Sequence, residues 1–116
     1  MDQRKQIKIG SLEGRLKSIF ANVTERRHKG LDISLQDLRD LWEKQKGLCA
    51  YSGVPMMWDD SNRYATVSID RIDSSKGYVR GNIAFCCAIV NVMKNKMPVE
   101  HFLWWCRNIS STLGEE

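Results

Sequence analysis

The spacing of apolar residues in the first part of the chain predicts an amphipathic helix over residues 11–27. Its apolar positions recur as on one face of a helix, and they are Leu12, Leu16, Ile19, Phe20 and Val23. Ser11 is the expected N-cap, because its hydroxyl can accept a hydrogen bond from a free amide of the first turn. Gly30 is expected to end this element.

A second helix is predicted over residues 34–47. Ser34 is its expected N-cap, Asp37 lies in the first turn, and Gly47 is expected to stop the helix. The apolar residues on its predicted buried face are Leu35, Leu38, Leu41 and Trp42.

The pattern then changes to short apolar segments. Residues 48–58 contain a glycine and a proline and are predicted to form a turn or hairpin. β-branched residues and alternation predict a strand over residues 64–70. Residues 74–81 are predicted to be a loop, and residues 82–87 a second short strand.

Two further helices are predicted over residues 87–96 and 97–113, with Pro98 tolerated in the first turn of the last one. In the first of these, Ile89, Val92 and Met93 are expected to face the core. In the last helix one stripe is expected to pack into the core: Phe102, Trp105, Cys106 and Ile109.

The order of elements predicts an α+β fold in a single domain, since a chain of 116 residues has the size of one. Its centre is a ββα unit. We expect a helical region over residues 1–46, the ββα core over residues 47–97, and a C-terminal helix with its tail over residues 98–116.

Composition adds constraints on location and partners. The net charge of +4 is a mild bias toward polyanions, and the early basic residues are Arg4, Lys5, Lys8, Arg26, Arg27 and Lys29. The chain has no apolar run long enough to predict a membrane span. Its charged N-terminus lacks a signal-peptide pattern. We therefore expect a cytoplasmic protein whose four cysteines are reduced thiols.

The ββα unit carries candidate metal chemistry. Asp70 ends the first predicted strand, and Asn91 lies on the helix that follows the second one. Their oxygens suit Mg²⁺, which often takes only one or two ligands from protein. Lys94 shares a helical face with Asn91, so it is expected to contact phosphate beside the metal.

The ordered motif "DRIDSSKGYVRGN", followed by "NVMKN", resembles HNH endonucleases, which have a ββα-metal fold. The resemblance spans residues 47–97 and is strongest to short forms encoded by phages and prophages. It implies a Mg²⁺- or Mn²⁺-dependent hydrolase that cuts DNA in a bacterial host cell.

The resemblance assigns roles residue by residue. Asp70 and Asn91 match the metal ligands, and Asn82 matches the asparagine that braces the loop and orients the base. Lys94 matches a basic position that often follows. Arg71 stands where the family has its general-base histidine. Catalytic roles thus fall on Arg71, Asn82 and Lys94, and candidate nucleic-acid contacts are Lys76, Arg80, Lys94 and Lys96.

Arg71 departs from the family pattern. A guanidinium stays protonated and cannot take a proton from water, but it can clamp a phosphate. A positioned base contributes about 10² to 10⁴ in rate, so its loss leaves room for slower catalysis. Alternative bases remain open, each with an ordinary structural explanation as well: Asp73, Tyr78, His28 and His101.

A second departure concerns zinc. Many relatives hold a structural Zn²⁺ with two Cys-x-x-Cys pairs. The corresponding pairs are Cys49 with Ser52 and Cys87 with Val90, so half of each is missing. We expect no structural zinc, and we expect Cys49 and Cys87 to be neighbouring buried thiols.

Three functions remain open from the sequence. The first is a metal-dependent DNA endonuclease, which would need two protomers, as a homodimer, or two binding events to cut a duplex. The second is a DNA-binding module with a weak or inactive site, for which Arg71 argues. The third is a protein-interaction or inhibitor domain encoded by a phage, for which the four tryptophans argue.

Overall fold

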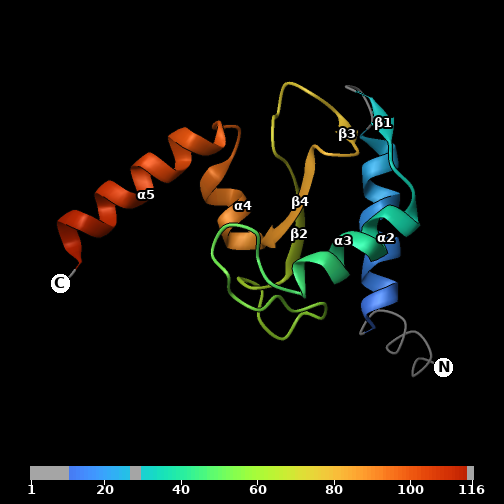
Figure 1. Cartoon of the computed structure of the whole chain (residues 1–116). Helices are drawn as coiled ribbons and strands as arrows, with labels where there is room; N and C mark the ends of the chain where they lie inside the picture. Colours follow the sequence, from blue (N-terminus) through green and yellow to red (C-terminus); the bar gives the residue numbers. More distant parts are fainter. Residues whose placement is uncertain (1–10, 27–29, 115–116) are drawn as a thin grey trace.

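The computed structural model describes residues 11–26 and 30–114, and over these ranges the chain forms an α+β fold with four helices and two small sheets (Figure 1). The elements are α2 Leu12–Glu25, β1 Leu31–Asp32, α3 Leu35–Gln45, β2 Val67–Arg71, β3 Tyr78–Val79, β4 Ile83–Cys87, α4 Ala88–Lys94 and α5 Val99–Leu113. The α+β class and the order of the main elements agree with the prediction. None of the helices in these ranges combines the length and apolar character needed to cross a membrane.

Both N-terminal helices begin as predicted. The Ser11 hydroxyl accepts a hydrogen bond from the Gly14 amide at 2.9 Å. Ser34 and Asp37 form a reciprocal capping box at the start of α3, each side chain accepting from the other residue's amide. These caps are local in sequence, which is why the pattern alone identifies them.

The two helix ends differ in how well they were predicted. α3 stops at Gln45, where Lys46 and Gly47 both adopt positive φ, so the predicted stop is confirmed. α2 ends at Glu25, with Arg26 as its C-cap, so the prediction that the helix runs to residue 27 and ends at Gly30 is wrong.

The central sheet pairs β2 with β4 in antiparallel register, with Asp70 opposite Ala84 and Val67 opposite Cys87. The strands were predicted, although β2 starts three residues later than expected at Val67. Residues 48–58 form the predicted turn, closed by a bridge between Leu48 and Pro55.

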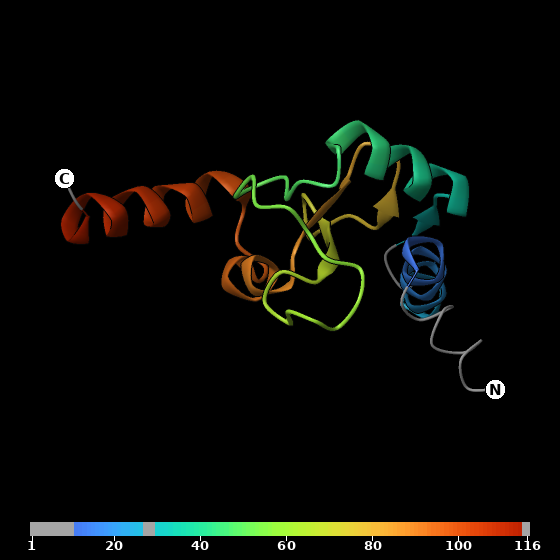
Figure 2. The same cartoon turned by 90° about the horizontal axis from the view of Figure 1, so that it is seen from below.

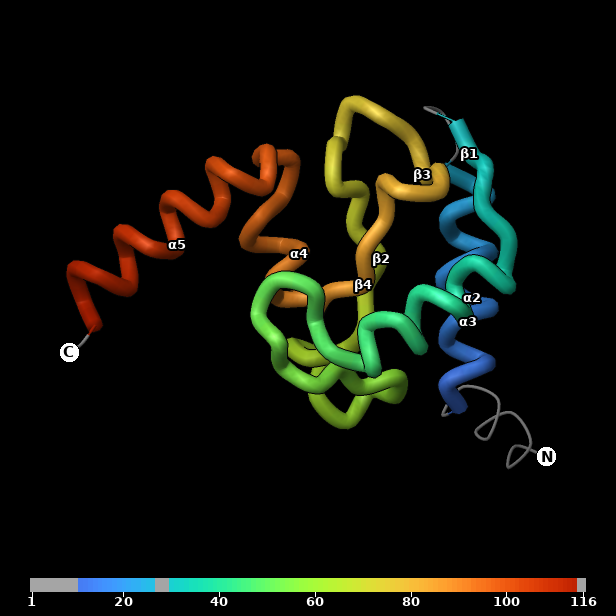
Figure 3. The backbone as a smooth tube through the Cα atoms, viewed as in Figure 1, coloured from blue at the N-terminus to red at the C-terminus, as the bar shows by residue number. Residues whose placement is uncertain are grey.

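A second sheet was missed by the sequence analysis. β3 lies inside the segment predicted as a loop and pairs in parallel with β1, so that Leu31 lies beside Tyr78. Figure 3 shows β3 lying beside β1. Two-residue strands carry too little pattern to be recognised without their partner.

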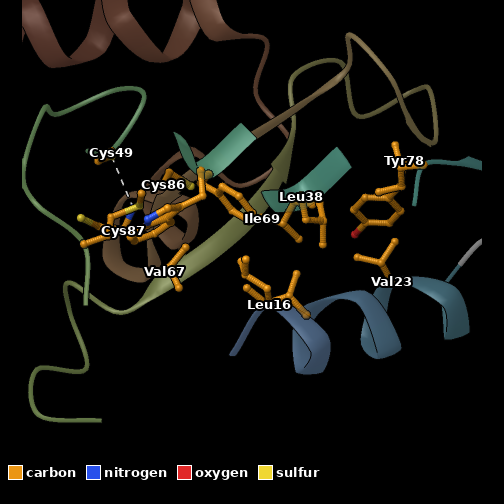
Figure 4. Packing of buried hydrophobic residues seen from close by; sticks show 14 residues of the cluster. Leu16, Val23, Leu38, Cys49, Val67, Ile69, Tyr78, Cys86 and Cys87 are labelled. Atoms are coloured by element: carbon orange, nitrogen blue, oxygen red, sulfur yellow. Dashed lines mark hydrogen bonds between the residues drawn. The ribbon is translucent and has the colours of Figure 1, made fainter. Parts of the chain in front are cut away.

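The core lies between the two N-terminal helices and the central sheet. Figure 4 shows Leu16 and Val23 of α2 facing Ile69 and Tyr78, with the three cysteines farther along the sheet. Fully buried members include Val23, Leu38 and Phe85. This packing fixes the end of β2, where Asp70 and Arg71 lie.

The helices after β4 are oriented differently from the prediction. On α4 the expected core residues Ile89, Val92 and Met93 are 37%, 73% and 54% exposed, whereas Lys94 is fully buried. The prediction for this face is therefore wrong. The reason is chemical, since the buried Asp70 carboxylate draws the Lys94 ammonium inward.

α5 projects away from the rest of the molecule, as both views show (Figures 1 and 2). Pro98 precedes the helix as its N-cap, so its predicted place in the first turn is off by one position. Phe102 is buried and Cys106 partly buried, but Trp105 and Ile109 are 54% and 56% exposed. The prediction that the whole stripe packs into the core is therefore wrong, because only the first turns of α5 contact the rest of the protein.

Candidate active site

The loop after β2 is held by one buried side chain, Asn82. Its amide nitrogen donates to the carbonyls of Asp73 at 3.1 Å and Gly77 at 2.9 Å. Its amide oxygen accepts from the Asp73 N–H at 2.9 Å. Asn82 therefore braces the loop that connects β2 to β4, which is the role that its position in the motif implied.

Asp70 lies at the centre of a buried polar group, which we call the Asp70 cluster: Asp70, Lys94 and Tyr51. Lys94 Nζ lies 3.2 Å from Oδ2 and 3.4 Å from Oδ1 of Asp70. The Tyr51 hydroxyl donates to Oδ2 at 2.7 Å. Asp70 is 5% exposed and Lys94 has no exposed surface, so the two charges neutralise one another inside the protein.

This arrangement changes the expected role of Lys94. Lys94 is fully buried in contact with Asp70, so its ammonium has no exposed surface to offer to a phosphate. Its Nζ also lies 3.5 Å from the Arg71 carbonyl, at the end of β2. Lys94 holds the end of the strand and partly neutralises Asp70.

Tyr51 was missed by the sequence analysis. It lies in the turn before β2, and its contact with Asp70 spans 19 residues, so no local spacing indicates it. Burial raises the pKa of Tyr51 far above its usual range, and the hydrogen bond to the Asp70 carboxylate raises it further. The phenol therefore stays protonated and acts as a hydrogen-bond donor.

Asn91 is oriented by strand β2. Its amide nitrogen donates to the Ser68 hydroxyl at 2.7 Å and to the Ile69 carbonyl at 3.2 Å. Among the described residues, no protein group donates to its Oδ1. The amide oxygen is thus the atom that Asn91 can offer to a ligand.

Asp70 and Asn91 line one open surface pocket, which we call the Asp70 pocket. Its lining residues are Arg26, Ile69, Asp70, Arg71, Ser74, Tyr78, Asn91, Asn95 and Lys96. Three of them, Arg26, Arg71 and Lys96, are cations, and the one carboxylate is already paired with Lys94. The local charge of this pocket therefore favours an anion.

Two arginines meet on one aromatic ring at this pocket. The guanidinium carbons of Arg71 and Arg26 lie 5.4 Å and 5.8 Å from the centre of the buried Tyr78 ring. Arg71 also donates to the Lys76 carbonyl at 3.2 Å. These contacts restrict both guanidinium groups before any ligand arrives. Arg26 is the C-cap of α2, so the ββα unit alone does not supply it.

The other predicted residues lie elsewhere. Arg80 pairs with Asp32 and Asp37 on the α3 side, outside the Asp70 pocket. Lys76 does not line the pocket with its side chain, and it enters the site through its carbonyl, which accepts from Arg71. Lys96 lines the Asp70 pocket.

Of the alternative bases within residues 11–26 and 30–114, Tyr78 lines the pocket, whereas Asp73 and His101 do not. Asp73 accepts from the Ser75 hydroxyl and amide, which lower its pKa, so it is a weak base. Tyr78 is buried beneath the two arginines, and His101 is exposed on α5. His28 and the basic positions Arg4, Lys5, Lys8, Arg27 and Lys29 lie outside the described residues.

The oxygen atoms at the Asp70 pocket suit a divalent ion that takes few ligands from protein. Over residues 11–26 and 30–114 no group of three or more histidine, cysteine, aspartate or glutamate side chains is placed to hold a metal. Mg²⁺ does not need such a group, since one or two protein oxygens suffice. Asp70 and Asn91 offer two oxygens at one pocket and so fit this ion, although Asp70 must share its charge with Lys94.

A second cluster of polar atoms lies at the far end of the sheet. The Cys49 thiol accepts from the Cys87 amide at 3.4 Å (Figure 4). It also accepts from the Ser52 amide at 3.4 Å. Burial raises the pKa of Cys49, but hydrogen bonds from the Ser52 hydroxyl and these amides outweigh it and lower the pKa. Cys49 and Cys87 are both buried free thiols, and the Cys87 amide contacts the Cys49 sulfur, so the prediction that they are buried neighbours is confirmed.

We expect that restoring two thiolates converts this cluster into a zinc site. The Ser52→Cys, Val90→Cys variant should bind one equivalent of Zn²⁺, because Cys49, Ser52 and Cys87 already converge and Val90 lies one helical turn beyond Cys87. Co²⁺ absorption and elemental analysis measure this. Wild type and Ser52→Cys alone are the controls, and both should bind less than stoichiometric metal. A double variant that binds no more Zn²⁺ than the controls would show that the four side chains do not converge on one ion.

Comparisons with protein-family models, with curated proteins and with solved structures found no match to this chain. The function must therefore be argued from the Asp70 pocket and from the sequence motif around it.

Proposed function

We propose that this chain is a metal-dependent DNA endonuclease of the HNH type, built on a ββα-metal core formed by β2, β4 and α4. The observation that carries the proposal is the Asp70 pocket, where three cations surround a carboxylate and an amide oxygen. A phosphodiester needs both kinds of group, because its own charge must be held while a metal ion is positioned beside it.

Each residue of the pocket has a role in this proposal. Asp70 and Asn91 would hold Mg²⁺ or Mn²⁺, and the bound ion would offset charge on the scissile phosphate and lower the pKa of a coordinated water. Arg71 binds a phosphate oxygen and stabilises the charge that develops there. Arg26 and Lys96 hold neighbouring phosphates and thereby position the strand.

The Asp70 cluster supports the chemistry indirectly. Tyr51 and Lys94 fix the Asp70 carboxylate in one orientation, so that little motion is left to freeze when a ligand binds. Asn82 holds the loop that contains Lys76 in one conformation, and the Lys76 carbonyl in turn accepts a hydrogen bond from Arg71.

A second function is favoured by a specific observation. Arg71 replaces the usual base, and Lys94 weakens the attraction of Asp70 for a cation, as expected of a module that binds DNA without cutting it. Such a module would use the same arginines and lysine for phosphate, and its affinity would fall steeply with salt.

The deciding experiment is plasmid nicking in Mg²⁺, Mn²⁺ and EDTA. We expect nicking that EDTA abolishes. Asn91→Ala removes one neutral oxygen ligand and should raise the Mg²⁺ concentration for half-maximal rate by about tenfold, a loss of about 1.4 kcal/mol. Asn108→Ala, which truncates an exposed asparagine of α5 outside the Asp70 pocket, is the control. Salt-sensitive DNA binding with no nicking in any metal would favour the second function.

A further inference from the structure

The outer part of α5 has no packing partner within the described chain. Phe102 anchors the helix through an edge contact with the Tyr51 ring at 6.1 Å. Beyond it, every residue from Leu103 to Leu113 is exposed except the partly buried Cys106. Isolated helices of this length are marginal in water and normally depend on packing of an apolar face. The helix thus presents a surface that needs a partner.

That surface is a ridge of large apolar side chains, which we call the α5 ridge: Trp105, Ile109 and Leu113. They follow one another at intervals of four residues and are 54%, 56% and 81% exposed. Rows with this spacing are the ones that pack into grooves of a second helix. Trp104 lies beside the ridge, and its ring meets the Trp105 ring edge-on at 4.8 Å. Leu103 is two residues before Trp105 and lies on another side of the helix.

The charge of the outer helix narrows the choice of partner. From Leu103 to Leu113 the only charged side chain is that of Arg107. Helices that bind a membrane surface carry many lysines or arginines on their polar face, and nucleic-acid contacts need cations as well. The ridge fits a nearly neutral, apolar helix instead.

We infer that the α5 ridge is a dimerisation surface and that its partner is α5 of a second copy, crossing it in the antiparallel sense. Ile109 is four residues from both Trp105 and Leu113, so a two-fold axis at Ile109 places Trp105 of each copy against Leu113 of the other. The ridge is therefore self-complementary, as an isologous contact requires. It brings together no like charges from the ridge itself.

The size of the contact sets the expected strength. The exposed tryptophans and aliphatic side chains offer on the order of 500 Å² per copy, and a pair would bury about 1,000 Å², the lower limit for a specific interface. We expect a dissociation constant on the order of 10 µM. This inference does not rest on the nuclease proposal, because it uses only α5.

Sedimentation velocity of the full chain over about 1–300 µM tests the inference, since this range brackets the expected constant. Wild type should pass from monomer to dimer. Ile109→Asp should weaken the dimer about a hundredfold, because two unpaired carboxylates would meet at the two-fold axis. Ser110→Asp adds the same charge next to the ridge and should leave the dimer intact. Thermal unfolding should be the same for both monomers, since neither residue is packed.

Disulfide trapping tests the direction. In a Cys106→Ser background, a mixture of Trp105→Cys and Leu113→Cys chains should give the mixed disulfide and little of either homodimer. Wild type that stays monomeric throughout, equal loss in Ile109→Asp and Ser110→Asp, or homodimeric disulfides would each overturn the inference. Binding to neutral or anionic vesicles by a monomer would assign the ridge to a membrane and overturn it as well.

Discussion

Lys94→Met is expected to lower the free energy of unfolding by about 3–5 kcal/mol, the usual cost of breaking a buried ion pair from one side. Methionine matches the length of the aliphatic stem, so the loss is mainly electrostatic. Asp70, which is only 5% exposed in the wild-type structure, would lose its paired charge and keep Tyr51 as its remaining side-chain donor. Urea unfolding followed by circular dichroism measures the change.

Two further variants make this prediction specific. Lys96→Met removes the same kind of charge two residues later from an exposed side chain and should change stability by less than about 0.5 kcal/mol. Asp70→Asn combined with Lys94→Met removes both charges and keeps an acceptor for Tyr51, so most of the loss should be recovered. Equal stabilities for Lys94→Met and Lys96→Met would mean that the pair contributes nothing.

Arg71→Ala is expected to reduce the nicking rate in Mg²⁺ by about 10²–10³, the range for removing one preorganised donor from developing charge. Arg71→Lys should recover part of this, since lysine keeps the charge but not the two-pronged geometry. Arg63→Ala is a matched control, because Arg63 also stacks on a tyrosine, Tyr64 at 5.4 Å, outside the Asp70 pocket. An Arg71→Ala enzyme as fast as the control would remove Arg71 from the site.

Arg71→His probes the same position through its pH dependence. Imidazole titrates near pH 6.5, and its neutral form accepts a proton. If Arg71 stands where HNH enzymes have their base, nicking by this variant should persist and rise as pH increases through the imidazole pKa. Wild type should lack this inflection between about pH 5.5 and 8. A flat profile for the variant would place the residue away from the attacking water.

The predictable part of the fold is the part set by neighbours in sequence. Ser11 and Ser34 cap helices through contacts three residues away, and the alternation before Asp70 is visible in a single strand. The burial of α4 and α5 was predicted wrongly because periodicity shows that a face is apolar but not which side the body lies on. Val92 and Ile109 illustrate this limit, because both lie on apolar faces and yet both are exposed.

The candidate site was predictable to the same extent. Asp70, Arg71, Asn82 and Asn91 are ordered along one motif, and the structure brings three of them to the pocket while Asn82 braces the loop beside it. Tyr51 and Arg26 come from elements outside that motif. Their contacts with Asp70 and Tyr78 depend on how those elements pack, and no spacing in the sequence encodes this.

The parallel pairing of β1 with β3 has a consequence for the order of folding. The pairing joins two two-residue strands that are far apart in the sequence. The chain between them, residues 33–77, must therefore close into a loop before the contact can add stability. Helix α2 and the β2–β4–α4 unit can each form from nearer contacts. Arg26 at the end of α2 therefore reaches the pocket beside Asp70 of β2 only when these two units dock. Under the proposed function, a chain halted before docking would have the Asp70 and Asn91 oxygens but would lack Arg26 at the pocket, so its nucleic-acid affinity would report completion of folding more sharply than its helix content does.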